Sequence, residues 1–424
     1  MKHVIIGNGP AGVVAAETLR KRRPADDIVM IGDEPHPSYS RMAIPYLLIG
    51  NIDERGTYLR KDPNHFESLR IRTVTGRVTS IDTAARKIRL SDGQSFEYDR
   101  ALIATGSSPM QPPIPGLDSP FVHPCWTLHD ARNILQLAKP GARVLQMGAG
   151  FIGCIILEAL AQRGVKLTVV EMGDRMVPRM MGEGAGGMIK RWCEHKGITV
   201  YTSTKVEALE PASAISARFS NGKTEEFDLV IQATGVRPNI GFLSGSPIKA
   251  LHGILTDQRM QTSVEGVYAA GDCSESFDPI TQSTIVSAIQ PNAVDQGYVA
   301  AVNMAGGQAS AKVVTQINVL DTLGLVSTSF GQWQGVSGGE HAELIDPQGF
   351  RYLRLEFDQD VLVGANSLGM TDHVGVMRGL VEGQIHLGEW KDRLMQDPTR
   401  LTEAYLATAQ AQAGFQGRSR GSMR

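Results

Sequence analysis

The pattern of apolar and polar residues occurs twice along the chain. Residues 3–12, HVIIGNGPAG, are an apolar run that ends in three glycines, and the helical periodicity of VVAAETLRKR leads into a second apolar run, DIVMIGDE. Residues 143–153, RVLQMGAGFIG, repeat this arrangement and are followed by the helical stretch IILEALAQRG and the apolar run KLTVVE. Each copy predicts a strand, a helix and a second strand, which is the βαβ unit of a parallel sheet.

The repeat continues beyond the two βαβ units. Residues 77–106 parallel residues 205–235, and each segment predicts strands joined by a turn dipeptide, Asp92-Gly93 in one and Asn221-Gly222 in the other. Each segment then ends in the tripeptide ATG. The chain therefore holds two copies of one module.

The C-terminal part of the chain follows a different pattern. From about residue 316 apolar and polar residues alternate, and FRYLRLEFD and VLVGANSL flank the turn Gln359-Asp360, which predicts a small antiparallel sheet with helices after it. The predicted fold is α/β, with two Rossmann-like dinucleotide-binding domains and a C-terminal α+β domain. The predicted boundaries are residues 1–111 with 242–310 for the first domain, 112–241 for the second, 311–395 for the third, and 396–424 for a helical or flexible tail.

Each glycine triplet fits the chemistry of a dinucleotide site. In Gly-x-Gly-x-x-Gly the first glycine permits a tight turn, the second lets the backbone approach a pyrophosphate, and the third lets helix and strand pack closely. An acid at the end of the second strand can bind a ribose hydroxyl. The first copy contributes Gly7, Gly9, Pro10, Ala11, Gly12, Asp33 and Glu34, and the second contributes Gly148, Gly150, Phe151, Ile152, Gly153 and Glu171. The alternative, two Rossmann-like domains that bind no ligand, is disfavoured because each triplet lies within a complete strand–helix–strand–acid unit.

Charge and cysteine content exclude several classes of function. The formal net charge of −2 argues against a nucleic acid or a membrane surface bound through bulk charge. The cysteines Cys125, Cys154, Cys193 and Cys273 form no CxxC or CxxxxC pair, which fits a reducing compartment and argues against an iron–sulfur or zinc site in this chain. The histidines show no metal-ligand spacing, so no metal is expected. The chain starts directly with a strand, so no signal peptide is expected and the predicted location is cytoplasmic.

The two glycine triplets, the two ATG segments and the late strand YAAGD together resemble the family of flavoproteins with two dinucleotide-binding domains. This family includes glutathione reductase, NADH oxidase, rubredoxin reductase, ferredoxin reductases of aromatic dioxygenases and the flavin domain of NADH-dependent nitrite reductase. The segments GDEPHPSYSR and LRLEFDQDVLVGANSLG resemble the rubredoxin and ferredoxin reductase branches and the nitrite reductase flavin domain. The resemblance covers about residues 1–395. It implies FAD in the first module, NAD(P)H in the second, and a C-terminal domain that covers the flavin and often forms a dimer interface, which leaves a homodimer open.

The same resemblance assigns individual residues to the cofactors. Asp272 would hydrogen-bond the ribityl chain of FAD, and Arg41 would contact FAD, the alternative being a surface arginine. Glu171 favours NADH because a carboxylate repels a 2′-phosphate, while Arg175 and Arg179 leave NADPH as the alternative. The remaining residues assigned to the cofactors are Val78, Ala104, Thr105, Gly106, Gly235 and Gly271.

The segment YSRMAIPY, residues 39–46, lacks side chains that related enzymes use beside the flavin. Disulfide reductases of the family carry CxxxxC in this region and other members carry one cysteine, but here the position is Met42, whose thioether cannot form a thiolate. Tyr46 stands where some members carry a lysine, and Ile155 lies where many carry an acid. In members that carry them, this lysine and this acid can pair with each other. The absence of both here is physically consistent, because either one alone would be a buried charge without a partner, at a cost of about 3–5 kcal/mol. Met42, Pro45 and Ile155 are therefore the expected flavin-facing residues, and no side chain is expected to be catalytic.

The sequence predicts an NADH-dependent FAD oxidoreductase without a redox-active thiol. In such an enzyme the cofactor carries the redox chemistry and the protein orients it. The expected acceptor is a separate iron–sulfur protein, a ferredoxin or a rubredoxin. Two alternatives stay open: an oxidase or small-molecule reductase that acts directly at the flavin, and a flavin subunit of a larger redox complex.

Overall fold

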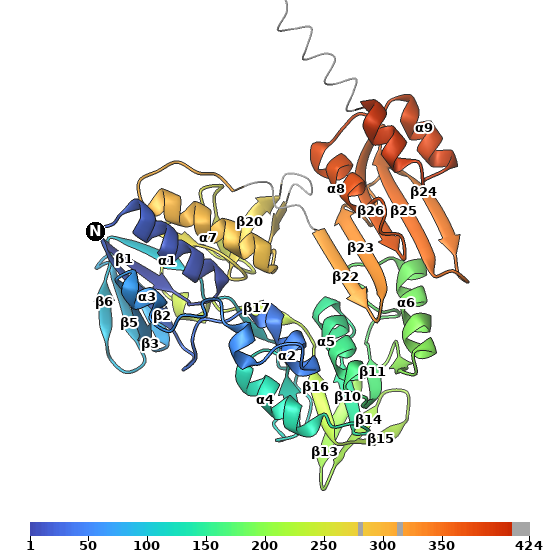
Figure 1. The fold of residues 1–424 in the computed structure, drawn as a ribbon, viewed down its shortest axis with the longest axis horizontal. Helices are drawn as coiled ribbons and strands as arrows, with labels where there is room; N and C mark the ends of the chain where they lie inside the picture. The colour runs from blue at the N-terminus through green and yellow to red at the C-terminus, as the bar shows by residue number, and fades with distance from the viewer. Residues whose placement is uncertain (279–282, 312–316, 409–424) are drawn as a thin grey trace, which may run out of the picture. The chain divides into compact units, whose positions relative to one another are not determined.

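The computed structural model describes residues 1–278, 283–311 and 317–408, whose elements form two compact units (Figure 1). Unit 1 comprises Met1–Met110, Trp126–Arg132 and Gly235–Val314, and unit 2 comprises Gln111–Cys125, Asn133–Thr234 and Thr315–Arg424. The C-terminal segment is thus grouped with the second module rather than with the first. The four domain boundaries proposed from the sequence stay a prediction.

Unit 1 is built on a five-stranded parallel sheet in the order β19-β7-β1-β2-β3. In this sheet Ile5 of the central strand lies opposite Met30 on one side and Leu102 on the other. The strands are β1 (Lys2–Ile6), β2 (Asp27–Gly32), β3 (Ile71–Thr75), β7 (Arg100–Ile103) and β19 (Val267–Ala269). Such apolar strands suit a parallel sheet that is covered on both faces.

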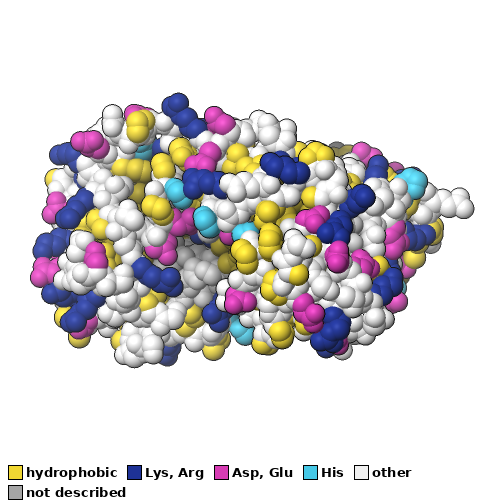
Figure 2. Space-filling model, turned by 90° about the horizontal axis from the view of Figure 1, so that it is seen from below, with side chains coloured by type: hydrophobic (Ala, Val, Ile, Leu, Met, Phe, Trp, Pro, Cys, Tyr) yellow, Lys and Arg dark blue, Asp and Glu magenta, His cyan; other side chains and the backbone are white. Residues whose placement is uncertain are grey.

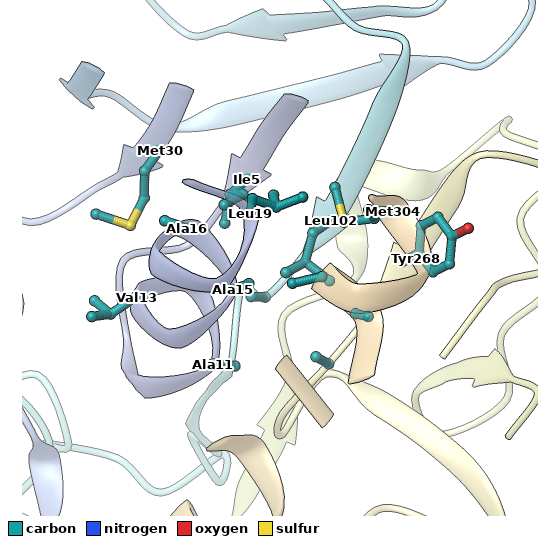
Figure 3. Packing of buried hydrophobic residues seen from close by; sticks show 14 of the residues in the cluster. Ile5, Ala11, Val13, Ala15, Ala16, Leu19, Met30, Leu102, Tyr268 and Met304 are labelled. Carbon is teal, nitrogen blue, oxygen red and sulfur yellow. The ribbon is translucent and has the colours of Figure 1, made fainter. Parts of the chain in front are cut away.

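Helices α1 (Pro10–Arg22) and α7 (Gln290–Met304) cover one face of this sheet, where Ile5, Leu19 and Met304 are buried (Figure 3). The two helices approach closely, because a Cβ built on Gly297 would lie 2.4 Å from the carbonyl oxygen of Ala11. The other face is covered by the meander β4 (Val78–Asp82), β5 (Lys87–Leu90) and β6 (Ser95–Glu97). Burial on both sides fixes the carboxyl end of β1, where the first glycine loop begins.

The segment between β2 and β3 is held in place by ion pairs within unit 1. The carboxylate of Glu17 on α1 accepts hydrogen bonds from Arg60 at 2.6 Å and pairs with His65 at 2.7 Å. The remaining elements of unit 1 are η1 (Arg41–Ala43), α2 (Ile44–Ile49), η2 (Glu54–Thr57), α3 (His65–Ser68), β8 (Ser107–Pro109), β17 (Val236–Pro238), η3 (Gly241–Leu243), β18 (Ile254–Thr256), β20 (Ser274–Asp278) and β21 (Ser283–Ile285).

Unit 2 contains a second parallel sheet, in the order β12-β11-β10-β16-β9. Its strands are β9 (Val122–Pro124), β10 (Arg143–Met147), β11 (Lys166–Val170), β12 (Thr199–Tyr201) and β16 (Leu229–Gln232), its helices are α4 (Leu128–Leu137), α5 (Phe151–Gln162) and α6 (Glu183–His195), and its meander is β13 (Val206–Pro211), β14 (Ile215–Phe219) and β15 (Thr224–Phe227). Asp92-Gly93 joins β5 to β6 and Asn221-Gly222 joins β14 to β15, so both turn predictions are confirmed. The first residues of α4 belong to the short segment that contributes to unit 1.

The C-terminal sheet of unit 2 is antiparallel, in the order β22-β23-β26-β25-β24. Its strands are β22 (Ile317–Thr322), β23 (Leu325–Gly331), β24 (Glu340–Asp346), β25 (Arg351–Asp358) and β26 (Val361–Leu368), and α8 (Val374–Gly383) and α9 (Glu389–Gln396) follow. The turn at Gln359-Asp360 joins β25 to β26 as expected. The Asn366 amide donates to the Met180 carbonyl oxygen at 3.1 Å, which ties this sheet to the second module. The fold class is confirmed, while residues 409–424 of the expected tail lie outside the described residues.

Lys and Arg side chains are interspersed with Asp and Glu on the face that Figure 2 shows. This agrees with the near-zero net charge of the chain. Across the described residues, none of the helices combines the length and the apolar character needed to cross a membrane. The same residues contain no group of three or more His, Cys, Asp or Glu side chains arranged to hold a metal ion.

Candidate functional site

The first glycine loop leaves an open space at the start of α1. A Cβ on Gly7, whose φ is +119°, would lie 2.0 Å from the Ala104 carbonyl oxygen, and a Cβ on Gly12 would lie 1.9 Å from that of Gly7. These two glycines are needed for backbone packing. Around Gly9, the residue that caps α1, a Cβ would have no atom of the described residues within 4 Å. The free space is where a backbone would meet a pyrophosphate at a helix N-terminus.

The carboxyl ends of β1, β7 and β19 meet at this loop. The Ala104 N–H donates to the Ile6 carbonyl oxygen at 2.7 Å, and a Cβ on Gly271 would lie 3.5 Å from that of Ala11. Thr105 and Gly106 continue from β7, and Asp272 follows Gly271. The structure therefore brings together three of the segments whose residues were assigned to FAD, all within unit 1.

Asp272 is partly buried and accepts a hydrogen bond from the Ser107 hydroxyl at 2.7 Å. Burial raises the pKa of Asp272 above its ordinary value, and the bond from Ser107 opposes this effect. Sequence reasoning missed Ser107, and the one signal that could have indicated it is its position directly after ATG.

The two acids after β2 differ in their surroundings. The Glu34 carboxylate accepts hydrogen bonds from the Tyr39 hydroxyl at 2.7 Å and from the Arg41 guanidinium at 2.9 Å, whereas Asp33 is exposed. Glu34 therefore holds the loop that carries Arg41, and the binding of a ribose hydroxyl by either acid stays a prediction. The start of β4, with Val78, lies near these acids, because the Gly76 N–H donates to the Gly32 carbonyl oxygen at 2.8 Å.

The segment YSRMAIPY forms η1 and α2. The Ser40 hydroxyl donates to Oε1 of Gln290, the first residue of α7, at 2.5 Å. The side chains of Met42 and Tyr46 are 49% and 56% exposed, and Pro45 is half-buried. Met42 and Pro45 belong to unit 1 and Ile155 belongs to unit 2, so a common flavin-facing role for the three stays a prediction.

The second glycine loop has the same steric pattern as the first. A Cβ on Gly148 would lie 2.3 Å from the Ala233 carbonyl oxygen, and a Cβ on Gly153 would lie 2.6 Å from that of Gly148. A methyl group on Gly150 would meet no heavy atom of the described chain within 4 Å. Phe151 and Ile152 are half-buried in the first turn of α5. Gly235, which was also assigned to the cofactors, belongs to unit 1, whereas the second glycine loop belongs to unit 2.

Glu171 lies at the end of β11 beside the second loop. Its carboxylate accepts hydrogen bonds from the Ala149 N–H at 2.8 Å and from the Gly173 N–H at 2.7 Å. The Arg175 guanidinium donates to the Met181 carbonyl oxygen at 2.9 Å and pairs with Asp174 at 2.7 Å. The acid is thus fixed at the loop, whereas the guanidinium of Arg175 is bound to its own segment.

All four cysteines are buried, and burial disfavours the thiolate at three of them. Burial raises the pKa of Cys154 and of Cys273, and raises that of Cys193 to about 12. The Cys273 thiol donates to the carbonyl oxygens of Ile103 and Ala270 at 3.4 Å. Because the thiolate is the reactive form of cysteine, burial disfavours a redox role for Cys154, Cys193 and Cys273 at neutral pH.

Replacing Asp272 with asparagine is expected to raise the melting temperature of the FAD-free protein at pH 7. The folded-state pKa is raised above the ordinary value of 3.8, so the ionised carboxylate disfavours folding at neutral pH, and this cost disappears as both states become protonated. The difference between variant and wild type should therefore shrink as the pH is lowered towards 4. Thermal unfolding at several pH values measures this, and a variant less stable than the wild type at pH 7 would contradict it.

The profile of the pyridine nucleotide-disulphide oxidoreductase family matches residues 1–305. The chain belongs to this family. It is an FAD-dependent NAD(P)H oxidoreductase, and the open second glycine of each loop fits the two dinucleotides. The expected cofactors are confirmed at that level.

Three known proteins illustrate what this oxidoreductase is similar to. It is 30% identical over 401 residues to subunit epsilon of the NADH-dependent phenylglyoxylate dehydrogenase of Aromatoleum evansii, covering 94% of this chain and 95% of that protein. It is 34% identical over 344 residues to an NADH oxidase of Methanocaldococcus jannaschii, covering 78% and 77%. A crystal structure of the covalent putidaredoxin reductase–putidaredoxin complex has the same fold, with a TM-score of 0.88, 21% identity and coverage of 96% and 99%.

Proposed function

We propose that this oxidoreductase transfers electrons from NADH to a separate iron–sulfur acceptor, without a thiol of its own in the path. When bound, FAD supplies the redox chemistry, since a flavin can accept two electrons as a hydride and release them singly. The protein binds and orients the two dinucleotides at its two glycine loops. The observation that carries the proposal is that residues 39–46 contain Met42 and no cysteine, while all four thiols of the chain are buried.

The geometry of Glu171 favours NADH over NADPH as the donor. Two loop amides hold its carboxylate beside the glycine loop, where the adenosine ribose of a dinucleotide would bind. A fixed negative charge there would repel the 2′-phosphate of NADPH. The nearby Arg175 is bound by Asp174 and a backbone carbonyl, which leaves it less able to neutralise a phosphate.

Two of the similar proteins bear on the electron acceptor in different ways. The structure with the same fold is a putidaredoxin reductase in covalent complex with putidaredoxin, which favours a separate protein as the acceptor. The relative from Aromatoleum evansii is by its name a subunit of a larger NADH-dependent dehydrogenase, and it matches almost the whole of this chain. This match favours, as a second candidate, a flavin subunit whose acceptor is a permanent partner. Co-purification from native cells separates the two candidates.

Replacing all four cysteines with alanine is expected to leave NADH-dependent ferricyanide reduction within about threefold of the wild-type rate per bound FAD, since electron transfer here requires no thiolate. Because each Cys side chain is buried, the melting temperature is expected to fall, and it should be measured alongside. The rate per bound FAD separates the two effects. A variant that retains FAD but loses turnover, together with a single cysteine that restores it, would show that a thiol takes part in the reaction.

A further inference from the structure

Trp126 lies in a short segment that contributes to unit 1. The Arg132 guanidinium, at the end of this segment, binds the Glu54 carboxylate with two hydrogen bonds of 2.7 and 2.9 Å. At its start, the Asp130 carboxylate accepts hydrogen bonds from the N–H groups of Thr127 at 2.8 Å and of Trp126 at 3.2 Å. The position of Trp126 is thus fixed by contacts on both sides.

The Trp126 side chain makes two different contacts with the residues of the first site. The Arg41 guanidinium carbon lies 5.1 Å from the centre of the indole ring, within the range of a cation–π interaction. The indole N–H donates to the carbonyl oxygen of Ser107 at 3.0 Å, and the Ser107 hydroxyl binds Asp272. One side chain therefore contacts Arg41 directly and Asp272 through one residue.

These contacts matter because the charged groups of Arg41 and Asp272 each have only one other described side-chain partner. The Arg41 side chain is 38% exposed, and Glu34 is the one hydrogen-bond partner of its guanidinium among the described residues. A guanidinium has five N–H donors in a plane, so fixing that plane decides where the remaining donors point. Asp272 has one described side-chain partner, Ser107, whose backbone is held by the pairing of β8 with β17 and by the indole N–H.

We propose that Trp126 is a positioning residue for FAD: its ring orients Arg41 towards the cofactor, and its N–H holds Ser107 so that Asp272 is placed for the ribityl chain. This rests on the proposed function, which requires bound FAD, and on the family resemblance that assigns Arg41 and Asp272 to that cofactor. A purely structural Trp126 would affect the stability of the protein but would show no dependence on Arg41.

The test is the FAD dissociation constant of Trp126→Leu, Trp126→Phe, Arg41→Gln and the Trp126→Leu/Arg41→Gln double variant. Trp126→Leu is expected to weaken FAD binding about three- to tenfold, the range of a partly desolvated cation–π contact. Trp126→Phe keeps an aromatic face and should recover most of the loss. The double variant should lose less affinity than the product of the two single effects, because contacting residues are not additive, while the part of the Trp126 effect that acts through Ser107 remains. Unchanged affinity in Trp126→Leu, or effects that multiply in the double variant, would overturn the proposal.

Trp192 provides a matched control in unit 2. Its indole N–H donates to the Thr322 carbonyl oxygen at 3.1 Å, and the Lys196 ammonium lies 4.5 Å from its ring centre. Trp192→Leu removes the same kinds of contact and should leave the FAD affinity unchanged. An equal loss of affinity in Trp192→Leu would show that the Trp126 effect is general destabilisation, which also overturns the proposal. If the wild-type protein binds no FAD, the proposed function fails instead, so the two failures are distinguishable.

Discussion

Alanine at Gly9 is expected to weaken FAD binding about ten- to hundredfold while the chain still folds, because overpacking a close contact typically costs about 1–3 kcal/mol. A Cβ at this position meets no atom within 4 Å in the part of the chain that the structure describes, and the backbone φ of −74° suits alanine. The methyl group would instead occupy the space that a pyrophosphate needs at the N-terminus of α1. Equilibrium FAD titration, with circular dichroism to verify the fold, measures both effects.

Two further glycines separate this effect from a general loss of structure. Gly12→Ala places a Cβ 1.9 Å from the Gly7 carbonyl oxygen, so it should destabilise the protein itself by about 3 kcal/mol or more. Gly241→Ala adds a methyl group at an exposed position of unit 1, where a Cβ meets no atom of the described residues within 4 Å. It should change neither the FAD affinity nor the stability of the protein. If Gly9→Ala binds FAD as tightly as Gly241→Ala does, the first loop is not the pyrophosphate site.

Alanine at Gly150 is expected to raise KM for NADH about tenfold or more while the protein keeps its full FAD content. Gly150 corresponds to Gly9 in the second copy: it caps α5, has a φ of −75°, and has no heavy atom of the described chain within 4 Å of a built Cβ. Steady-state kinetics with ferricyanide, together with the ratio of bound FAD to protein, measures the result.

The matched control for Gly150 is Gly187 on α6. A Cβ on Gly187 also meets open space within the described part of unit 2, but this glycine lies in a helix interior. Gly187→Ala should leave KM unchanged and should stabilise the helix by up to about 1 kcal/mol. Loss of FAD from Gly150→Ala, with normal NADH kinetics for the FAD-loaded fraction, would mean that the assignment of cofactors to the two loops is reversed.

The features that could be predicted from the sequence depend on short, local patterns. The strand–glycine–helix–strand units, the turns at Asp92-Gly93 and Asn221-Gly222, and the antiparallel pair around Gln359 each have a signature of a few residues. Steric requirements fix these signatures, as at Gly7, where a side chain would overlap the backbone of Ala104, the residue after β7. The family is therefore recognisable even at about 30% identity to its relatives.

The features that could not be predicted depend on contacts between distant positions. Arg132 and Glu54 are 78 residues apart, and nothing near either residue indicates that the Trp126–Arg132 segment contributes to unit 1. Asn366 and Met180 are 186 residues apart, and their contact joins the C-terminal sheet to the second module. Such side chains show no periodic pattern, because a single partner elsewhere in the fold determines each of them.

The acids after β2 show the same limit within the site itself. In the sequence Asp33 and Glu34 are equivalent ribose acceptors, since both follow the strand. Only the fold shows that Tyr39 and Arg41 bind the carboxylate of Glu34. Partners that are five and seven residues away in an irregular segment leave no periodic signal in the sequence.

The proposed function requires above all that the electron acceptor is a separate protein, and neither a thiol of this chain nor oxygen. The most direct test measures NADH turnover by the purified, FAD-loaded protein with ferricyanide and, separately, with oxygen. We expect rapid ferricyanide reduction and slow oxygen consumption. Oxygen consumption as fast as ferricyanide reduction would contradict the proposal and would favour an oxidase, and failure of NADH to reduce the bound flavin would contradict the assignment of the donor.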